Sequence, residues 1–292
     1  MNKPHITQAM IDAYDDYTHL TLDRRDFMGK LTKLAGSGAA AAAIVPLLAA
    51  NSAKAAIVAE DDKRLKGQDI TYPGSTGDMK GYLVYPADRS GRLPAVIVIH
   101  ENRGLNPHIR DVARRIALEG FVVLAPDFLS PLGGTPPDED RARGMFDRLT
   151  PGQVSADGVT TVAFLEKNEL TNGKVGVVGF CWGGGAANNL AVASPDLAAA
   201  VAYYGAQPKK KEDIAKIKAP LLLHYAGKDE RTNAGIDAYK AALNAAGKQY
   251  TIYVYEGAQH AFNNDTSEAR YDKQAAELAW GRTIAFLKEK LS

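Results

Sequence analysis

The chain has 292 residues, of which 46% are hydrophobic and 24% are charged, a composition typical of a globular protein rather than a disordered or fibrous one. Its 35 basic and 34 acidic side chains nearly cancel, and Lys and Arg do not cluster on one element, so we expect no nucleic-acid partner. The single cysteine excludes an intrachain disulfide and a zinc site built on several thiolates.

Residues 20–55 differ from the rest of the chain in composition and in the order of their charged, apolar and small residues. Arg24 and Arg25 precede a mildly apolar, Ala-rich stretch, which is followed by a small-x-small pattern that ends at Ala55. This order resembles a twin-arginine signal, the kind that exports folded proteins. We therefore expect residues 1–55 to be an export signal read by the twin-arginine machinery, and the protein to be periplasmic. An ordinary N-terminal helix is the alternative.

From residue 56 onward, short apolar runs typical of strands alternate with longer stretches typical of helices. The predicted strands are 80–85, 95–99, 121–124, 175–178, 199–203, 220–224 and 250–255, and the predicted helices are 106–119, 138–147, 152–168, 182–193, 233–246 and 268–290. This alternation predicts one α/β domain over 56–292, with a mostly parallel central sheet and helices on both of its faces.

The only cysteine, Cys181, directly follows a predicted strand and directly precedes a predicted helix, within the pattern Gly-Phe-Cys-Trp-Gly. G-x-C-x-G in this context is the nucleophile elbow of α/β hydrolases with Cys in place of Ser. The turn is tight, so Gly179 and Gly183 have to be small. The helix N-terminus favours a thiolate, and the N–H of Trp182 can face an oxyanion. A buried, inert cysteine and a glycine-rich phosphate loop are the alternatives.

A nucleophile of this kind needs an acid and a base further along the chain, in that order. His260 is the only histidine beyond the last predicted strand, and Asp229 follows the predicted strand 220–224. Each candidate stands after a strand, at the edge where open α/β sheets place their sites. We therefore predict a triad of Cys181, His260 and Asp229, with Glu230 as the alternative acid.

Together these motifs resemble the dienelactone hydrolase family, the carboxymethylenebutenolidase-like α/β hydrolases. The residues that carry the resemblance are 98–105, 174–184, 202–205 and 257–262. The resemblance implies an α/β-hydrolase fold and an enzyme that hydrolyses esters or lactones through a Cys-His-Asp triad. It also implies that the enzyme needs no cofactor. The sequence has no H-E-x-x-H motif and no His/carboxylate cluster, so we do not expect a metal-dependent hydrolase.

The resemblance also assigns roles to the residues after the strand 95–99. It implies that Glu101 contacts the resting thiol and holds its proton until substrate arrives, which would protect the sulfur from oxidation. In the alternative, Glu101 pairs with Arg103. The backbone N–H of Asn102 would be the second oxyanion donor.

The chain departs from the family at one position. Dienelactone hydrolases proper carry an arginine four residues after the triad histidine, where it binds the substrate carboxylate, and this chain has Asn264 there. Arg103 is a candidate substitute for that arginine. We expect the chain to share the fold and triad of the family, but we do not expect dienelactone to be its substrate. Trp182 and Tyr203 either line the pocket or pack in the core. We expect the loop 126–137 to cover the pocket.

The sequence thus predicts a cysteine hydrolase that forms a thioester with a small ester or lactone, preferably one with an enol leaving group. Two alternatives use the same fold. An acyltransferase would pass the acyl group from the thioester to an amine or alcohol, and a non-catalytic protein would use the thiol as a redox sensor.

Overall fold

The structure is a computed structural model that describes residues 4–19, 22–49 and 56–292. Its eight strands form one sheet in the order β1-β2-β4-β3-β5-β6-β7-β8. The six strands from β4 to β8 in this order pair in parallel, and the two antiparallel pairings, β1 with β2 and β2 with β4, lie at one edge. The strands are β1 (Leu65–Pro73), β2 (Asp78–Pro86), β3 (Leu93–Ile99), β4 (Val122–Asp127), β5 (Thr171–Phe180), β6 (Ala199–Tyr203), β7 (Leu221–Ala226) and β8 (Tyr250–Tyr255).

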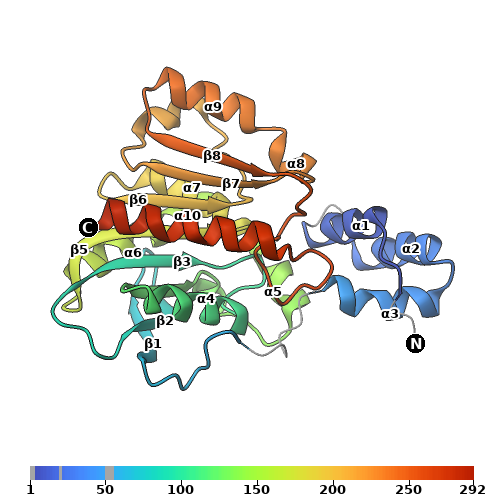
Figure 1. Ribbon diagram of the computed structural model, residues 1–292, viewed down its shortest axis with the longest axis horizontal. Coiled ribbons are helices and arrows are strands. Elements are labelled where there is room, and N and C mark those ends of the chain that lie inside the picture. The colour runs from blue at the N-terminus through green and yellow to red at the C-terminus, as the bar shows by residue number, and fades with distance from the viewer. Residues whose placement is uncertain (1–3, 20–21, 50–55) are drawn as a thin grey trace.

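Helices cover both faces of the sheet (Figure 1). Val96 and Val98 of β3 point to the face covered by α4 (Pro107–Leu118) and α10 (Lys273–Leu291), and Ile97 and Ile99 point to the opposite face. That second face is covered by α6 (Pro151–Lys167), α7 (Trp182–Ala193) and α9 (Ile236–Ala245). Because both faces of the inner strands β3, β4, β6 and β7 are buried, these strands are continuous apolar runs. The predicted α/β-hydrolase fold is confirmed.

Most predicted elements are present, with shifted ends. The predicted helix 233–246 corresponds to α9, which begins at Ile236 after its N-cap Gly235, and a separate short helix, α8 (Glu230–Asn233), precedes it. Strand β1 was missed because it is a mostly exposed edge strand with few apolar residues. The remaining elements are α5 (Glu139–Met145) and the 3₁₀ turns Ser130–Leu132, Phe146–Arg148 and Lys211–Lys216.

The N-terminal segment folds into three helices, α1 (Gln8–Thr18), α2 (Arg24–Ala35) and α3 (Gly38–Leu48). They lie together at one end of the sheet, beside α5 and α8 (Figure 1). They share an apolar core of their own, formed by Met10, Ala13, Tyr14, Tyr17, Phe27, Leu31, Ala41, Ile44 and Leu48. These residues therefore have a packed tertiary structure.

The segment gives only weak evidence for a membrane span. Within the described residues, no single helix is both long and apolar enough to cross a membrane, and α2 and α3 qualify only as a pair bent by 110°. The predicted cleavage pattern that ends at Ala55 lies outside the described residues. The export signal therefore stays a prediction.

Candidate active site

The sharp turn between β5 and α7 places Cys181 at the carboxyl edge of the sheet. Cys181 has φ 55° and ψ −116°. This backbone conformation is strained for any residue other than glycine, and strained residues of this kind are typical of functional turns. A Cβ on Gly179 would lie 1.9 Å from the carbonyl oxygen of Gly183, and one on Gly183 would lie 2.4 Å from that of Ile99. Both glycines are therefore required by backbone contact, and the chain has the strand–turn–helix geometry of the predicted elbow.

The predicted acid and base meet beside the cysteine. Nδ1 of His260 lies 2.5 Å from Oδ2 of Asp229, and Oδ1 of Asp229 accepts the backbone N–H of Thr232 at 3.1 Å. The His260 side chain is 95% buried, and its Nε2 has no hydrogen-bond partner within the described part of the chain. A ring nitrogen of His260 lies within 4.8 Å of Sγ of Cys181. The three predicted residues thus come together, and Asp229, not Glu230, contacts the histidine.

Electrostatics favour an ion pair between the sulfur and the imidazole. Burial alone would raise the pKa of the Cys181 thiol, but the electrostatic interactions with His260 and then His19, together with the contact from Nε2 of His19, lower this pKa to about 6. Burial alone would lower the pKa of His260, but Asp229, Asp15 and Cys181 together hold it well above its ordinary value. The electrostatics of the site therefore favour a thiolate at Cys181 and an imidazolium at His260.

This ion pair predicts the pH dependence of the thiol's reactivity. Because the pKa of Cys181 is lowered to about 6, the reactive thiolate persists at neutral pH and is lost only as the pH falls through 6. Alkylation by iodoacetamide should be nearly constant from pH 7 to 8 and fall about tenfold per unit well below pH 6. The rate can be followed by intact mass, since the chain has one cysteine. A rate that still climbs tenfold between pH 7 and 8 would contradict the ion pair.

A cavity of about 380 Å³ opens above the sulfur and includes Cys181, His260, Trp182 and Asn102 in its wall. Trp182 lines the pocket as predicted. Tyr203 does not: it is fully buried and its hydroxyl lies 2.7 Å from Oγ1 of Thr283. Other residues of the wall, which the sequence did not predict, are Thr18, Arg143, Phe146, Leu149, Pro151, Val154, Tyr204 and Arg231. The segment 143–155 therefore lines the pocket in place of the loop 126–137.

The residues after β3 have partners other than those predicted. Oε2 of Glu101 accepts a hydrogen bond from Nδ2 of Asn264 at 2.9 Å, while Oε1 is buried without a hydrogen-bond partner in the described chain. Arg103 pairs with Glu139 at 2.7 Å and donates to the hydroxyl of Tyr14 at 2.6 Å. Arg103 and Asn264 are not part of the pocket wall. The thiol-holding role of Glu101 stays a prediction.

The two residues expected to supply the oxyanion donors line the same pocket as Cys181. Trp182 is the first residue of α7, so its amide is one of the N–H groups that the helix itself leaves unpaired. Asn102 also lines the pocket, and its side chain donates to the carbonyl oxygen of Thr18 at 2.6 Å. Their positions are compatible with an oxyanion hole, and the role stays predicted for both.

Sequence reasoning missed one histidine at the site. Nε2 of His19 lies 3.5 Å from Sγ of Cys181, and its ring stacks edge-on against His260 at a centroid distance of 4.8 Å. His19 lies within the predicted export signal and carries no motif, so nothing in its sequence context marks it. Only the packing of the N-terminal helices reveals it.

An elbow nucleophile, a histidine and an acid at the carboxyl edge of a mostly parallel sheet define an α/β hydrolase. The profile of the Dienelactone hydrolase family (DLH) matches residues 79–291. The chain belongs to the dienelactone hydrolase family, and the prediction of an ester- or lactone-hydrolysing enzyme is thereby confirmed.

Three relatives illustrate the similarity. A protein of Escherichia coli (strain K12) named "Putative carboxymethylenebutenolidase" is 32% identical over 82% of this chain and 93% of its own. Protein usf of Aquifex pyrophilus is 36% identical over 77% of this chain and 100% of its own. The crystal structure titled "Putative Dienelactone Hydrolase" from Klebsiella pneumoniae has 29% identity and a TM-score of 0.69, and covers 77% of this chain and 98% of its own.

Proposed function

We propose that the protein is a cysteine hydrolase that cleaves activated esters or lactones through a thioester. The observation that carries this proposal is the position of Cys181 at the elbow, facing a buried histidine whose other nitrogen is held by Asp229 at 2.5 Å. Such an arrangement activates a thiol by taking up its proton and orienting the imidazole.

The reaction would proceed in two steps. The Cys181 thiolate attacks the carbonyl carbon, and the N–H groups of Trp182 and Asn102 receive the negative charge on the carbonyl oxygen. The tetrahedral intermediate collapses with cleavage of the C–O bond, and His260 gives its proton to the departing oxygen. His260 then takes a proton from a water molecule, and the resulting hydroxide attacks the carbonyl carbon of the thioester. Cleavage of the C–S bond releases the acid and restores the thiolate.

The chemistry of the thiolate limits the substrate class. A thiolate is a better leaving group than an alkoxide, so the tetrahedral intermediate from an ordinary alkyl ester returns to substrate more often than it advances. Enol esters and enol lactones avoid this loss because an enolate leaves readily. The cavity of about 380 Å³ is of a size for a small molecule. Because Asn264 stands where the family carries arginine, we do not extend the proposal to dienelactone itself.

We also propose that the twin-arginine machinery exports the protein to the periplasm. The support comes from the order of the sequence signals and from the exposure of both arginines. The Arg24 side chain is 75% exposed, although it pairs with Asp140, so the export machinery can reach the motif while the chain is folded. Fractionation of cells, with and without replacement of Arg24 and Arg25 by lysine, tests this proposal.

Replacing Cys181 with alanine should abolish turnover of an activated ester such as p-nitrophenyl acetate. We expect a loss of about 10³-fold or more, because the only nucleophile is removed. Acid-quenched full-length wild type should carry one acetyl group by intact mass, and the Cys181→Ala variant should carry none. Equal turnover by the two proteins would refute the proposal.

The same experiment separates the two alternatives. A wild-type protein that is acetylated but releases acetate only when an amine or alcohol is added would be an acyltransferase. A wild-type protein that is neither acetylated nor active, but that gains the mass of one oxygen atom at a low peroxide concentration, would use Cys181 as a redox sensor. Either outcome contradicts hydrolysis.

A further inference from the structure

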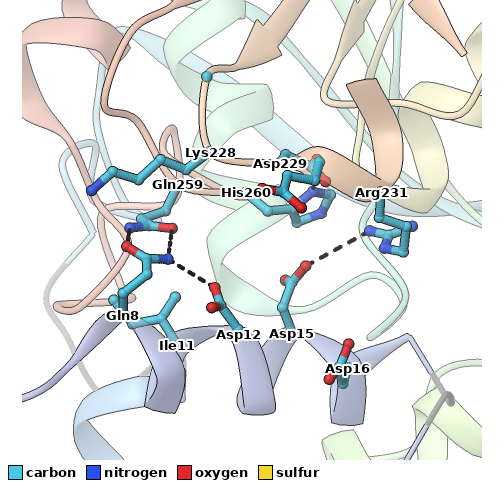
Figure 2. Close-up of a pocket in the computed structure, with 12 residues that line it drawn as sticks. Gln8, Ile11, Asp12, Asp15, Asp16, Lys228, Asp229, Arg231, Gln259 and His260 are labelled. Atoms are coloured by element: carbon cyan, nitrogen blue, oxygen red, sulfur yellow. Dashed lines mark hydrogen bonds and ion pairs between the residues drawn. The ribbon is translucent and has the colours of Figure 1, made fainter. Parts of the chain in front are cut away.

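Helix α1 and the residues that flank it contact each loop that carries a predicted catalytic group. The side-chain amides of Gln8 and Gln259 exchange two hydrogen bonds, at 2.9 and 2.5 Å, directly before His260 in the chain. The carbonyl oxygen of Thr18 holds the Asn102 side chain. Figure 2 shows α1 with its side chains facing Asp229, His260 and Arg231 across a cavity of about 660 Å³.

Buried aromatic and cationic contacts fix the segment to the domain. The guanidinium of Arg143 lies 3.9 Å from the ring centroid of Tyr17 and donates to the carbonyl oxygen of the same residue. Tyr14 accepts a hydrogen bond from Arg103, and the guanidinium of Arg270 lies 5.0 Å from its ring centroid. Cation–π contacts of this kind are strongest where they are desolvated. Removing the segment would leave Arg103, Arg143 and Arg270 without these partners.

His19 stands at the end of this segment, in direct contact with the sulfur. Its Nδ1 lies 2.8 Å from the carbonyl oxygen of Asp15, which can only accept, so Nδ1 carries a proton and Nε2 faces Cys181. Nε2 also lies 2.8 Å from Nη2 of Arg231. The guanidinium therefore approaches the same ring nitrogen that faces the sulfur, and ring nitrogens of both His19 and His260 lie within 4.8 Å of Sγ.

We propose that residues 5–19 are a retained part of the working active site, and that His19 is a positioning residue that holds the Cys181 sulfur. The inference rests on the proposed function, because it assigns His19 to the same thiol. It also gives the resting thiol a partner other than Glu101, whose carboxylate is bonded to Asn264. A twin-arginine signal that stays attached after export satisfies both proposals, since that route carries folded proteins.

The contact with His19 affects the protonation of the Cys181 sulfur. The interactions with His19 favour the thiolate, in the same direction as those with His260 and against the burial of the sulfur. Arg231 adds a positive charge beside Nε2 of His19. The other titratable groups near the thiol and its two histidines are Asp15, Asp229, Glu101 and Tyr204. The pocket keeps about 380 Å³ with His19 in place, so the histidine forms part of its wall without filling it.

The test compares His19→Gln with His5→Gln in the full-length chain. His5 is an exposed histidine of the same segment and lies outside the pocket wall, so it is a matched control. The readout is the pH profile of Cys181 alkylation by iodoacetamide, which needs no ester turnover. We expect His5→Gln to match wild type and His19→Gln to shift the midpoint upward by about one pH unit, with alkylation at pH 6 slowed roughly 5- to 10-fold.

A His19→Gln profile that superimposes on wild type would overturn the positioning role. If that variant unfolds, Arg231→Gln removes the charge beside Nε2 of His19 and should shift the midpoint in the same direction by a smaller amount. No shift in that variant would equally overturn the role. The intact mass of the exported protein tests retention. We expect the exported chain to contain residues 5–19, and a product that begins at residue 56 would refute retention.

Failure of the Cys181→Ala turnover experiment would instead refute the proposed hydrolysis, and it would leave the thiol measurements valid.

Discussion

Replacing Asp229 with asparagine should lower kcat/KM for an activated ester by about 10³-fold, or about 4 kcal/mol of transition-state stabilisation. The carboxylate accepts a hydrogen bond from Nδ1–H of His260 at 2.5 Å and thereby keeps Nε2 turned to the sulfur. An asparagine can present an N–H to Nδ1 instead, which would stabilise the wrong tautomer. Steady-state kinetics of the purified full-length variant measure the loss.

The neighbouring carboxylate provides the matched control. Glu230 is exposed and is the alternative acid that the sequence allows, so Glu230→Gln should change kcat/KM by less than about twofold. Asp229 also caps α8 by accepting the N–H of Thr232, and asparagine caps helices as well as aspartate, so the variant should remain folded. If Glu230→Gln were the damaged enzyme and Asp229→Asn the active one, the assignment of the acid would be wrong.

A shift in the alkylation profile should accompany the loss of activity. The pKa of His260 is held well above its ordinary value, with Asp229 the largest of the charges that raise it. Without that charge the imidazolium is less stable, and so is the thiolate that faces it. The acid limb of Cys181 alkylation should therefore move above pH 6 in Asp229→Asn. A variant with lost activity but an unmoved profile would show that Asp229 acts after the thiolate has formed.

The triad could be predicted from sequence because each member is tied to a local signal. Cys181 stands between glycines that the backbone itself requires. Asp229 follows β7, a fully buried apolar strand, and His260 follows the edge strand β8, which is marked by its aromatic and β-branched residues. Parallel strands bring their carboxyl ends to one edge, so chain order alone brings these side chains together. The long-range geometry of the site thus follows from local patterns and one topological rule.

The remaining wall of the pocket could not be predicted in this way. His19 reaches the sulfur from 162 positions away in the sequence, through a segment whose composition resembles an export signal. Tyr203 and Tyr204 are adjacent in sequence, and only Tyr204 lines the pocket, because the backbone of Tyr204 has φ 38° and turns it out of the sheet. Neither a contact between distant segments nor a single dihedral angle leaves a pattern that composition or periodicity can detect.

Replacing Gly183 with alanine should destabilise the whole domain as well as the elbow. A Cβ there would lie 2.4 Å from the carbonyl oxygen of Ile99 and 2.5 Å from that of His100, and both are backbone atoms that cannot move aside as a flexible side chain would. Forcing α7 away from the end of β3 should cost about 3 kcal/mol or more, which lowers Tm by about 6–12 °C in a domain of this size. Thermal unfolding followed by circular dichroism measures the change.

Gly185, two residues further along the same helix, isolates the effect of the contact. Its added Cβ would find its nearest neighbour, the backbone nitrogen of Ala206, at an ordinary 3.5 Å. Alanine is favoured over glycine in a helix by up to about 1 kcal/mol, so Gly185→Ala should unfold at the wild-type temperature or slightly above it. Gly183→Ala gains the same helix propensity, so the difference between the two melting temperatures reports the clash with β3. Equal melting temperatures would mean that the elbow can relax, and that Gly183 is not required by contact with the strand that carries Glu101 and Asn102 at its end.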